Sequence, residues 1–496
     1  MEQIENPVES LDSLRAGAAI YFIGIGGVSM GGLAKMALQL GYRIAGSDPH
    51  ESERTKQLEA MGVTIHYQHH PQWIEDFMPD VVIYTAAIPY WNVEMRRAAE
   101  LGVPCIDRAV FLGWLTRAYD HVINVAGTHG KTTTTAMISD IMIETQRDPS
   151  VHLGAEFADF GHSTVRLGRT GDLLISEACE YNNSLLHFHS TTAVLLNIDY
   201  DHMDFFSGID DLIETFAKFT AELPEGGHLI YWRDGEYIEQ FLERSTQLRS
   251  EARAGRIHRL SFGIADAEVP LEDFPTAADR GGIADYAAAN LSFEAGYPRF
   301  DVYRRGIFYC SIKLSVPGRH NVLNALAAIA ASDVNRALPE ACERALAHFE
   351  GTEGRFTFKG RYHGAEVVAD YAHHPSSTVA TLEAARALAK KRIHVVYQPL
   401  TFARVKQLFD RYVEALRDCE DLIFFEIYSD RESDTLGMSS RLICEALQQE
   451  GCPAVFAEDY PAIVEHLSRE VEAGDLILFL GPEQVRSFAD RLVREA

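Results

Sequence analysis

The feature that most constrains this chain is the stretch 121–138, which reads HVINVAGTHGKTTTTAMI. An apolar, strand-like run leads into a Gly-Thr-His-Gly turn, and Lys131 and Thr132 then open a segment with helical spacing of apolar residues. In a strand–turn–helix unit, the N–H groups of the turn and the N-terminus of the helix converge on one point and favour a phosphate group there. The stretch therefore predicts an α/β domain that binds a nucleotide phosphate.

The loop is a shortened variant of the general phosphate-binding pattern. That pattern asks for a glycine five residues before Gly130, but Val125 stands there and the first glycine is Gly127. Lys131 would reach the β- and γ-phosphates, and the Thr132 hydroxyl would hold Mg²⁺. The alternative is a glycine turn with a purely structural lysine.

Composition limits the classes of function. A length of 496 residues suggests about three domains, and a formal charge of −27 argues against nucleic-acid and anionic-membrane partners. The seven cysteines include no Cys-x-x-Cys pair, so they indicate neither a zinc site nor a disulfide framework. No run of 18 apolar residues and no signal-type apolar core occurs, so we expect a soluble, cytoplasmic protein.

The first 117 residues alternate short apolar runs with helical patterns, which predicts a small parallel, Rossmann-like domain. The expected strands are 18–25, 43–47, 63–66, 81–86 and 103–106. The first turn contains Gly26 and Gly27, with Ser29 in place of the third glycine of a dinucleotide fingerprint and Asp48 after the next strand. NAD, FAD, a UDP-sugar and a turn without any ligand all remain open.

Polar side chains follow two expected strands of the second domain. Strand 172–176 leads into Glu177, and strand 193–198 leads towards His202. Open α/β sheets assemble their sites at the carboxyl ends of strands, and a carboxylate suits Mg²⁺. A histidine at a strand end is also common as a structural hydrogen-bonding group, so the role of His202 stays open.

The pattern then changes to period two at about 285–316, which predicts an antiparallel hairpin, while 247–285 is expected to be irregular. Asn321 and Asn324 share one face of the following helix, where both could contact adenine; the alternative is that Asn321 caps the helix.

The third domain repeats the α/β rhythm from about Gly351. We expect strands at 366–369, 393–397, 422–425 and 476–480, and helices near 376–390, 402–417, 439–449 and 483–495. The first two strands end near Asp370, His373 and Arg404, so this domain is expected to contribute to a cleft.

These motifs together resemble the Mur ligases over nearly the whole chain. The shortened loop of that family appears here as Ala-Gly-Thr-His-Gly-Lys-Thr-Thr, and His129 in place of asparagine resembles the branch that acts on the first amino acid or on recycled tripeptide. The family's dispersed polar set is present in full: Lys131, Glu177, His202, Asn321, Asn324, Arg355 and Asp370.

The resemblance implies an N-terminal Rossmann-like domain for a UDP-substrate (1–117), a central P-loop ATPase-type domain with a mostly parallel sheet and an antiparallel hairpin (118–350), and a Rossmann-like closing domain (351–496). It implies ATP and Mg²⁺, and most closely a ligase that joins L-alanine to UDP-N-acetylmuramate through an acyl phosphate in peptidoglycan precursor synthesis. A monomer or weak homodimer is expected.

The resemblance also implies site roles. The implied catalytic residues are Lys131, Glu177, His202 and Arg355. The implied ATP-binding residues are Gly127, Thr128, His129, Gly130, Lys131, Thr132, Thr133, Asn321, Asn324, Arg355 and Asp370. Thr132, Glu177 and His202 would hold metal, Gly26, Gly27 and Ser29 would face the UDP-substrate, and His373 and Arg404 would face the amino acid.

The chain departs from the family at a few positions. Thr401 stands where relatives carry an arginine, Gly354 replaces one of two paired arginines, Cys179 replaces an acidic residue, and residues 481–484 alter a glycine-rich turn. The alternatives are a tripeptide-recycling muramate ligase, which the segment 398–401 argues against, a divergent or non-catalytic paralogue, and an NAD-dependent oxidoreductase, which would leave Lys131 without a role.

Overall fold

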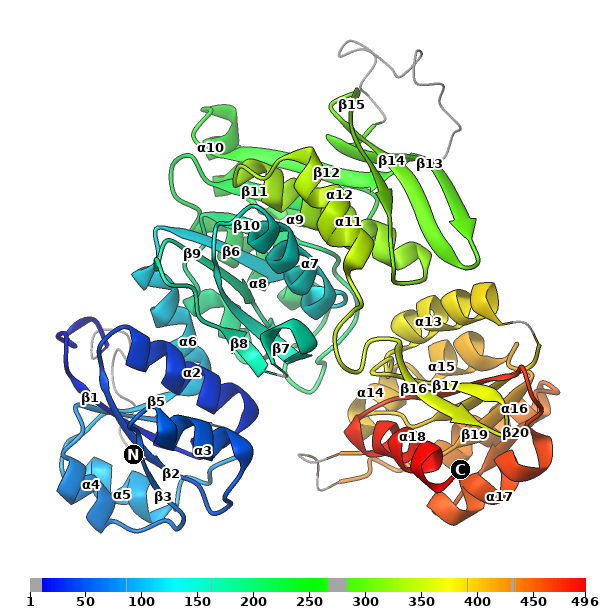
Figure 1. Cartoon of the computed structure of the whole chain (residues 1–496), viewed down its shortest axis with the longest axis horizontal. Coiled ribbons are helices and arrows are strands. Elements are labelled where there is room, and N and C mark those ends of the chain that lie inside the picture. Colours follow the sequence, from blue (N-terminus) through cyan, green and yellow to red (C-terminus); the bar gives the residue numbers. More distant parts are fainter. Residues whose placement is uncertain are drawn as a thin grey trace.

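The computed structural model describes residues 11–85, 87–161, 163–265, 283–389, 391–429, 432 and 434–496. Three β-sheets with flanking helices follow one another along the chain and form three lobes (Figure 1). This arrangement agrees with the predicted three-part α/β class. Residues 1–10 of the predicted first domain lie outside the described part.

The first sheet has five parallel strands in the order β3-β2-β1-β4-β5. The chain first adds β2 and β3 on one side of β1 and then β4 and β5 on its other side. The turn after β1 therefore lies at the switch point where such sheets bind ligands. The short helix α4 was not predicted. The strands are β1 (Ala19–Ile23), β2 (Arg43–Ser47), β3 (Thr64–His66), β4 (Val81–Tyr84) and β5 (Cys105–Asp107), and the helices are α2 (Val28–Gln39), α3 (Glu53–Ala60), α4 (Gln72–Phe77), α5 (Val93–Glu100) and α6 (Arg108–Leu115).

The central sheet has ten strands in the order β15-β14-β13-β12-β11-β10-β6-β9-β7-β8. Pairing is parallel from β13 to β7, and antiparallel in the β13–β14–β15 meander and in the β7–β8 pair, which confirms the predicted hairpin. The strands are β6 (His121–Ala126), β7 (Ser150–Phe157), β8 (Ser163–Arg166), β9 (Leu173–Glu177), β10 (Thr192–Leu195), β11 (His228–Trp232), β12 (His258–Ile264), β13 (Tyr286–Glu294), β14 (Tyr297–Arg304) and β15 (Ile307–Lys313).

The helices of this region are α7 (Lys131–Glu144), α8 (Ile209–Ala221), α9 (Ile238–Arg244), α10 (Thr246–Arg253), α11 (Arg319–Val334) and α12 (Pro339–His348). The prediction that 247–285 is irregular is wrong for α10 and β12, because the β12 side chains Leu260 and Phe262 are buried beside β11 although its first two residues are exposed. Residues 266–282 of that segment lie outside the described part.

The third sheet has the order β16-β17-β21-β18-β19-β20, with only β16 antiparallel. The helix predicted at 402–417 is divided in two at Leu408, whose ψ is 21°. The strands are β16 (Thr357–Tyr362), β17 (Ala365–Asp370), β18 (Ile393–Tyr397), β19 (Asp421–Phe424), β20 (Ala454–Phe456) and β21 (Leu476–Leu480), and the helices are α13 (Pro375–Leu388), α14 (Phe402–Gln407), α15 (Phe409–Leu416), α16 (Ser440–Gln449), α17 (Tyr460–Glu470) and α18 (Glu483–Glu495).

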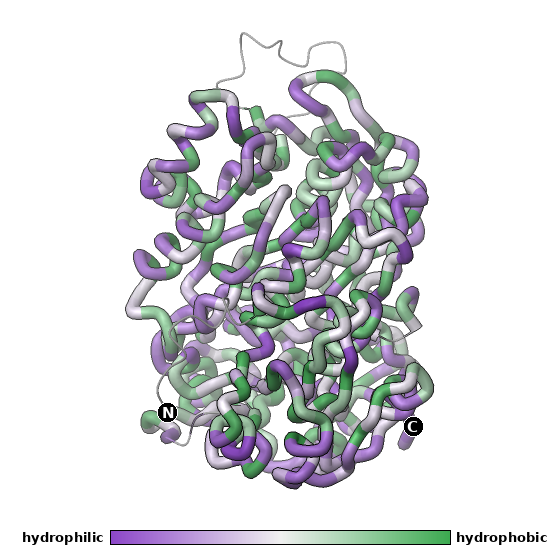
Figure 2. The backbone as a smooth tube through the Cα atoms, turned by 90° about the vertical axis from the view of Figure 1, so that its left-hand side faces the viewer, coloured by the Kyte–Doolittle hydropathy of each residue, from purple (hydrophilic) through white to green (hydrophobic). Residues whose placement is uncertain are grey.

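Apolar residues are distributed among all three lobes. Hydrophobic and hydrophilic stretches are interspersed along the whole tube in Figure 2. None of the helices in the described ranges is both long and apolar enough to cross a membrane.

Candidate active site between the central and C-terminal lobes

A cleft of about 730 Å³ lies between the central sheet and the third sheet. Its walls come from the phosphate loop, the ends of β9 and β10, the start of α11, and the segments that follow β17 and β18. Of the residues predicted for ATP, metal and amino acid, only Gly127 does not line it. The predicted lining residues are Thr128, His129, Gly130, Lys131, Thr132, Thr133, Glu177, His202, Asn321, Asn324, Arg355, Asp370, His373 and Arg404.

The phosphate loop needs its glycines. Gly127 has φ +128°, and a Cβ there would lie 3.0 Å from backbone atoms of Asn197, while Gly130 has φ +87° and a Cβ would lie 2.6 Å from Asn324 Oδ1. The Asn197 side chain brackets the loop, because its Oδ1 accepts from the His129 N–H at 2.8 Å and its Nδ2 donates to the His129 carbonyl at 2.9 Å. The loop is thus fixed in shape by its neighbours.

Lys131 at the start of α7 is folded back onto protein acceptors. Its Nζ donates to Gly127 O at 2.5 Å, to Thr128 O at 3.2 Å and to the Glu180 carboxylate at 3.0 and 3.2 Å. Burial opposes the charge of Lys131, but the nearby Glu180 outweighs it and raises the pKa of Lys131 to about 12. The lysine is therefore charged and ready to exchange these acceptors for phosphate oxygens.

A carboxylate and a hydroxyl meet beside this lysine. Thr132 Oγ1 donates to Glu177 Oε2 at 3.1 Å, and the Gly154 N–H donates to Glu177 Oε1 at 2.5 Å. Arg355 reaches the same Thr132 hydroxyl with its Nη2 at 3.4 Å. Burial raises the pKa of Glu177. Oxygen ligands of this kind suit Mg²⁺, which a buried carboxylate also needs as a counter-charge.

His202 has the features of a metal ligand. Burial lowers the pKa of His202, so its imidazole is neutral, and its Nδ1 is buried without a hydrogen-bond partner among the described residues. Its Nε2 lies 3.7 Å from Glu180 Oε1. The backbone at His202 has φ +59°, a conformation uncommon for a residue other than glycine.

The two asparagines are connected to each other. Asn324 Nδ2 donates to Asn321 Oδ1 at 3.0 Å, and Asn321 Nδ2 donates to Pro317 O at 2.7 Å. The alternative that Asn321 caps the helix is wrong, because the N-cap is Gly318 and makes no side-chain cap. Asn324 keeps its oxygen towards Gly130, beside the phosphate loop.

The residues predicted to face the amino acid are already engaged. Arg404 is buried, and its Nε and Nη2 both donate to Asp201 Oδ1, at 2.9 and 2.6 Å. Although burial opposes ionisation of Asp201, the Arg404 charge holds the pKa of that carboxyl well below its usual range. His373 Nδ1 lies 2.7 Å from the carbonyl oxygen of Tyr371. Asp370 joins the segment before β16 to the segment after β17, since it accepts from the N–H groups of Phe356 and Ala372 at 3.0 and 2.9 Å.

Two arginines in this region were not predicted. Arg411 on α15 lines the cleft and donates to Asp199 Oδ1 at 3.1 Å. Arg486 on α18 lies beside Gly354, where an added Cβ would meet its guanidinium, and it shares the ring of Tyr371 with Arg355, with guanidinium-to-centroid distances of 5.3 and 4.9 Å. Arg486 thus fills the space beside the glycine that replaces a paired arginine. Both lie in the first turn of their helices, and no sequence motif marks them.

The glycine turn after β1 lies outside this cleft. Gly27 caps the start of α2, and the Gly26 N–H donates to Asp48 Oδ2 at 3.0 Å, so Asp48 folds onto the turn. In the dinucleotide pattern that carboxylate contacts a ribose, whereas the Asp48 carboxylate here accepts from backbone N–H groups of Gly26 and His50.

Ser29 joins this turn to the central lobe. Its hydroxyl accepts from Arg108 Nη1 at 2.9 Å and lies 3.2 Å from His152 Nε2 on β7. Burial, with Arg108 nearby, lowers the pKa of His152 to about 3. Arg108, the first residue of α6, thus places a cation beside the glycine turn. The sequence pattern did not indicate this residue.

Comparison with known proteins agrees with this architecture. Three family descriptions match consecutive parts of the chain: "Mur ligase family, catalytic domain" at 19–120, "Mur ligase middle domain" at 125–332, and "Mur ligase, glutamate ligase domain" at 354–482. A UDP-N-acetylmuramate–L-alanine ligase of Acetivibrio thermocellus is 37% identical over 477 residues, which are 96% of each chain.

The chain belongs to the Mur ligase family. A second relative with the same name, from Caldanaerobacter subterraneus subsp. tengcongensis, is 36% identical over 96% of this chain and 97% of its own. Among solved structures, the UDP-N-acetylmuramate–alanine ligase of Thermotoga maritima superposes with a TM-score of 0.74 at 24% identity, covering 96% of this chain and 98% of that one. A murein peptide ligase of Psychrobacter arcticus superposes with a TM-score of 0.65 at 22% identity, covering 96% of this chain and 98% of that one. These likenesses confirm the Mur ligase fold.

Proposed function

We propose that this Mur ligase joins L-alanine to the carboxylate of UDP-N-acetylmuramate with hydrolysis of ATP to ADP, a step of peptidoglycan precursor synthesis. The observation that carries the proposal is 36–37% identity over 96% of the chain to relatives named for that reaction. The cleft supports it, because one space unites a charged lysine at a phosphate loop with cations from the third sheet.

In this proposal the chain has three functional domains, with boundaries at about residues 117 and 350. Segment 1–117 binds the UDP-substrate through Gly26, Gly27 and Ser29, and Arg108 beside Ser29 adds a charge for the diphosphate. Segment 118–350 binds ATP, and segment 351–496 closes over the cleft with the amino acid.

The chemistry follows from the charges around the phosphate loop. The muramate carboxylate attacks the γ-phosphate to give an acyl phosphate and ADP, and the amine of L-alanine then displaces phosphate from the acyl carbon. Lys131 and Arg355 neutralise charge on the transferred group, since phosphoryl transfer depends mainly on positioning and electrostatics. Thr132, Glu177 and His202 would hold Mg²⁺, which shields the phosphate oxygens.

The remaining polar groups position the reactants. Asn324 would receive adenine beside the loop, and Asp370 would hold the closing segment at Arg355. Arg404 would exchange one contact with Asp201 for the alanine carboxylate, assisted by His373. Arg411 lines the same cleft and supplies a cation in a region where Thr401 does not.

The proposal is tested by phosphate release with ATP, Mg²⁺ and UDP-N-acetylmuramate, adding L-alanine, glycine, L-serine or tripeptide one at a time. We expect release that depends on L-alanine and is lost in Lys131→Ala but kept in Lys313→Ala, which removes an exposed lysine of β15. Release with tripeptide alone would identify the recycling activity instead, and no release with any acceptor would refute the ligase.

A further inference from the structure

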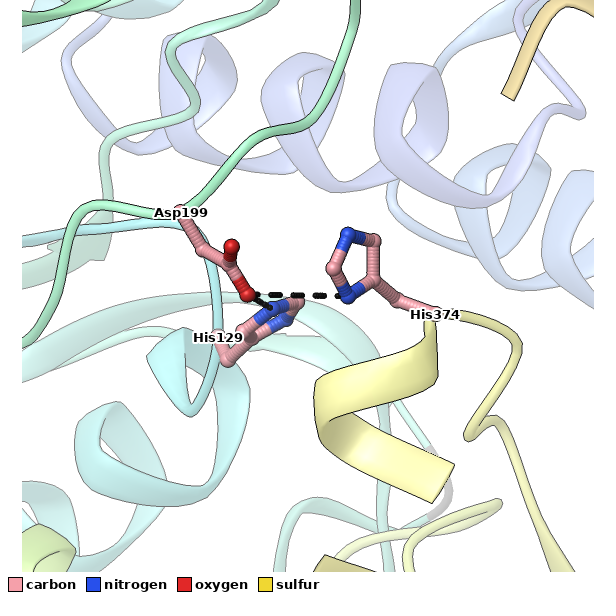
Figure 3. A group of neighbouring side chains, drawn as sticks. All are labelled: His129, Asp199 and His374. Carbon is pink, nitrogen blue, oxygen red and sulfur yellow. Dashed lines mark hydrogen bonds and ion pairs between the residues drawn. The ribbon is translucent and has the colours of Figure 1, made fainter. Parts of the chain in front are cut away.

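Three ligand-type side chains meet where the phosphate loop touches the C-terminal lobe. His129 comes from the loop, Asp199 follows β10, and His374 directly precedes α13 (Figure 3). Asp199 Oδ2 lies 3.2 Å from His129 Nε2 and 3.6 Å from His374 Nδ1. The three ligand atoms all lie within 4.8 Å of one another.

The spacing suits a small divalent ion. Zinc–nitrogen and zinc–oxygen bonds of about 2.0–2.2 Å at tetrahedral corners place ligand atoms roughly 3.3–3.6 Å apart. The two separations from Asp199 Oδ2, 3.2 and 3.6 Å, lie just below and at the upper end of this range. The His374 side chain is 1% exposed and that of Asp199 12%, whereas His129 is 25% exposed and borders the cleft. The fourth coordination position of the ion would therefore be open to water from the cleft.

The hydrogen bonds of His374 place its Nδ1 near the Asp199 carboxylate. Its Nε2 lies 3.0 Å from the carbonyl oxygen of Tyr200, so that nitrogen carries the proton and donates. Nδ1 is then an acceptor, and it caps α13 through a long hydrogen bond of 3.3 Å from the Ser376 N–H. Nδ1 also lies 3.6 Å from Asp199 Oδ2, so a cation between the two atoms would replace that weak cap. A backbone carbonyl on the far ring nitrogen is the usual support of a metal-binding histidine.

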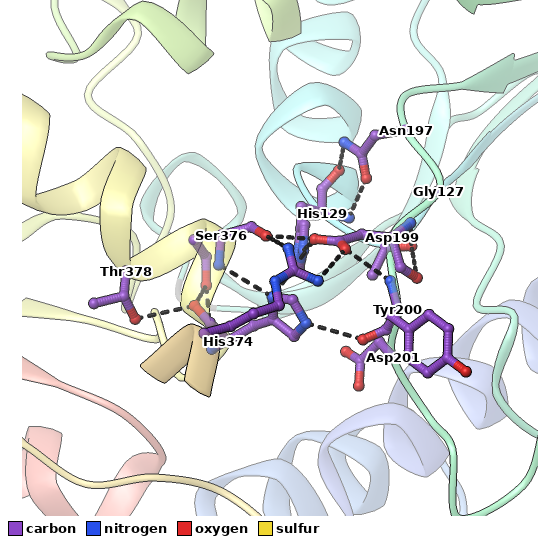
Figure 4. Close-up of polar contacts among 12 residues, drawn as sticks. Gly127, His129, Asn197, Asp199, Tyr200, Asp201, His374, Ser376 and Thr378 are labelled. Atoms are coloured by element: carbon purple, nitrogen blue, oxygen red, sulfur yellow. Dashed lines mark hydrogen bonds and ion pairs between the residues drawn. The ribbon is translucent and has the colours of Figure 1, made fainter. Parts of the chain in front are cut away.

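The other contacts of Asp199 are compatible with a metal. Arg411 donates to the opposite oxygen, Oδ1, at 3.1 Å. The Ser376 hydroxyl donates to Oδ2 at 2.5 Å (Figure 4). The same hydroxyl accepts from Arg411 Nη2 at 2.9 Å. A hydroxyl turns about one bond, so Ser376 can leave Oδ2 without moving the backbone.

We propose that His129, Asp199 and His374 form a binding site for a borderline-soft divalent ion such as Zn²⁺, which joins the phosphate loop to the C-terminal lobe. Two imidazoles and one carboxylate favour such ions, whereas Mg²⁺ prefers the oxygen ligands at Thr132 and Glu177. Because the ion is held from both sides of the cleft, it opposes separation of the lobes and should slow the passage of nucleotide into and out of the cleft that both lobes line. The occupied site is therefore inhibitory.

The binding test uses the full chain and metal alone, in saturating Mg²⁺. Co²⁺ should bind with the visible absorption of a nitrogen-ligated, low-coordinate ion, and Zn²⁺ should displace it. His374→Asn and His129→Asn should each weaken Co²⁺ binding at least tenfold. Asparagine at position 374 keeps an acceptor for the α13 N-terminus, so the helix cap survives the change. Circular dichroism checks that both variants fold.

Matched controls separate this site from the magnesium ligands. His187→Gln changes a histidine outside the cleft and should bind Co²⁺ as the unchanged chain does. If His202→Gln abolishes the signal while His374→Asn keeps it, the ion sits at the magnesium site and the proposal is wrong. No Co²⁺ signal in the unchanged chain would also overturn it.

A second arm rests on the proposed function. Zn²⁺ added in excess Mg²⁺ should inhibit L-alanine-dependent phosphate release, EDTA should reverse the inhibition, and His374→Asn should need at least tenfold more Zn²⁺ for the same fractional loss. Equal sensitivity of the two proteins would refute the inhibitory role. Failure of all turnover would refute the proposed function and leave the binding result standing.

Discussion

The pairing of Lys131 with Glu180 gives a prediction with a magnitude. Glu180 has a side chain that is 1% exposed, and Lys131 Nζ lies 3.0 Å from its Oε2. Lys131→Ala removes this counter-charge, and the next cationic candidate, His202 Nε2, is 3.7 Å away on a ring whose pKa is lowered by burial. The substitution should therefore destabilise the protein as well as abolish ATP chemistry.

Two physical estimates bracket the decrease in the free energy of unfolding. Removing one partner of a buried ion pair costs about 3–5 kcal/mol. The rise of the Lys131 pKa from 10.5 to about 12 corresponds to roughly 2 kcal/mol, because one pKa unit is about 1.4 kcal/mol. The second estimate is smaller since it already subtracts the burial cost of the lysine and ignores the carboxylate left behind. We expect Lys131→Ala to lower the free energy of unfolding by about 2–5 kcal/mol.

The assay is thermal unfolding of the nucleotide-free protein. For a domain of about 150–250 residues, 1 kcal/mol shifts Tm by about 2–4 °C, so Lys131→Ala should lower the Tm of its domain by roughly 4–20 °C. The double variant Lys131→Ala with Glu180→Gln should recover most of that loss and stay inactive, because a neutral amide needs no counter-ion. Equal Tm values for the single and double variants would refute the pairing argument.

Three further outcomes follow from the cleft. Gly130→Ala should weaken ATP binding at least about tenfold in a nucleotide titration, because a left-handed backbone costs about 1–2 kcal/mol with a side chain and its Cβ would lie 2.6 Å from Asn324 Oδ1. Arg404→Lys should raise the Michaelis constant for L-alanine about tenfold, since lysine cannot reproduce the forked contact with Asp201. Burial raises the pKa of Glu177, so the Mg²⁺ affinity measured from turnover should fall as the pH drops through that raised pKa and should be constant above it.

Each of these outcomes has a clear opposite. Unchanged ATP affinity in Gly130→Ala would show that the loop relaxes around a Cβ. An unchanged Michaelis constant in Arg404→Lys would assign the alanine carboxylate to another cation, for which Arg411 is the candidate. A pH-dependent Mg²⁺ affinity that persists in Glu177→Gln would place the titrating group elsewhere.

The local elements were largely predictable because their signals are local. Strands β2, β18 and β21 and helix α18 have the predicted bounds, since each is a continuous apolar or amphipathic segment between turns. In the first and third lobes, the helix predicted at 402–417 is two helices, and the elements α4, α17, β16 and β20 were not predicted. Most of these are three to six residues long, too short for a periodic pattern to distinguish them from loops.

The phosphate loop was readable because the chemistry of phosphate binding requires fixed residue types at fixed spacing. The seven dispersed polar residues have no such spacing and were identified through the resemblance to the Mur ligases. The sequence by itself therefore determined the α/β class, the nucleotide site and the membership of a family. The partners of those residues depend on how distant segments pack. Only the tertiary structure brings Glu180 to Lys131, Asp201 to Arg404, and Arg486 to the space beside Gly354.

The His129–Asp199–His374 cluster shows the same division. Each residue lies beside a motif that the sequence identifies, yet none of the spacings between them, 70 and 175 residues along the chain, has a pattern. They meet because the carboxyl ends of β6 and β10 share one edge of the central sheet and α13 begins opposite that edge. Sequence determines local geometry through short-range sterics and periodic burial, whereas the meeting of lobes depends on the packing of surfaces that no local pattern encodes.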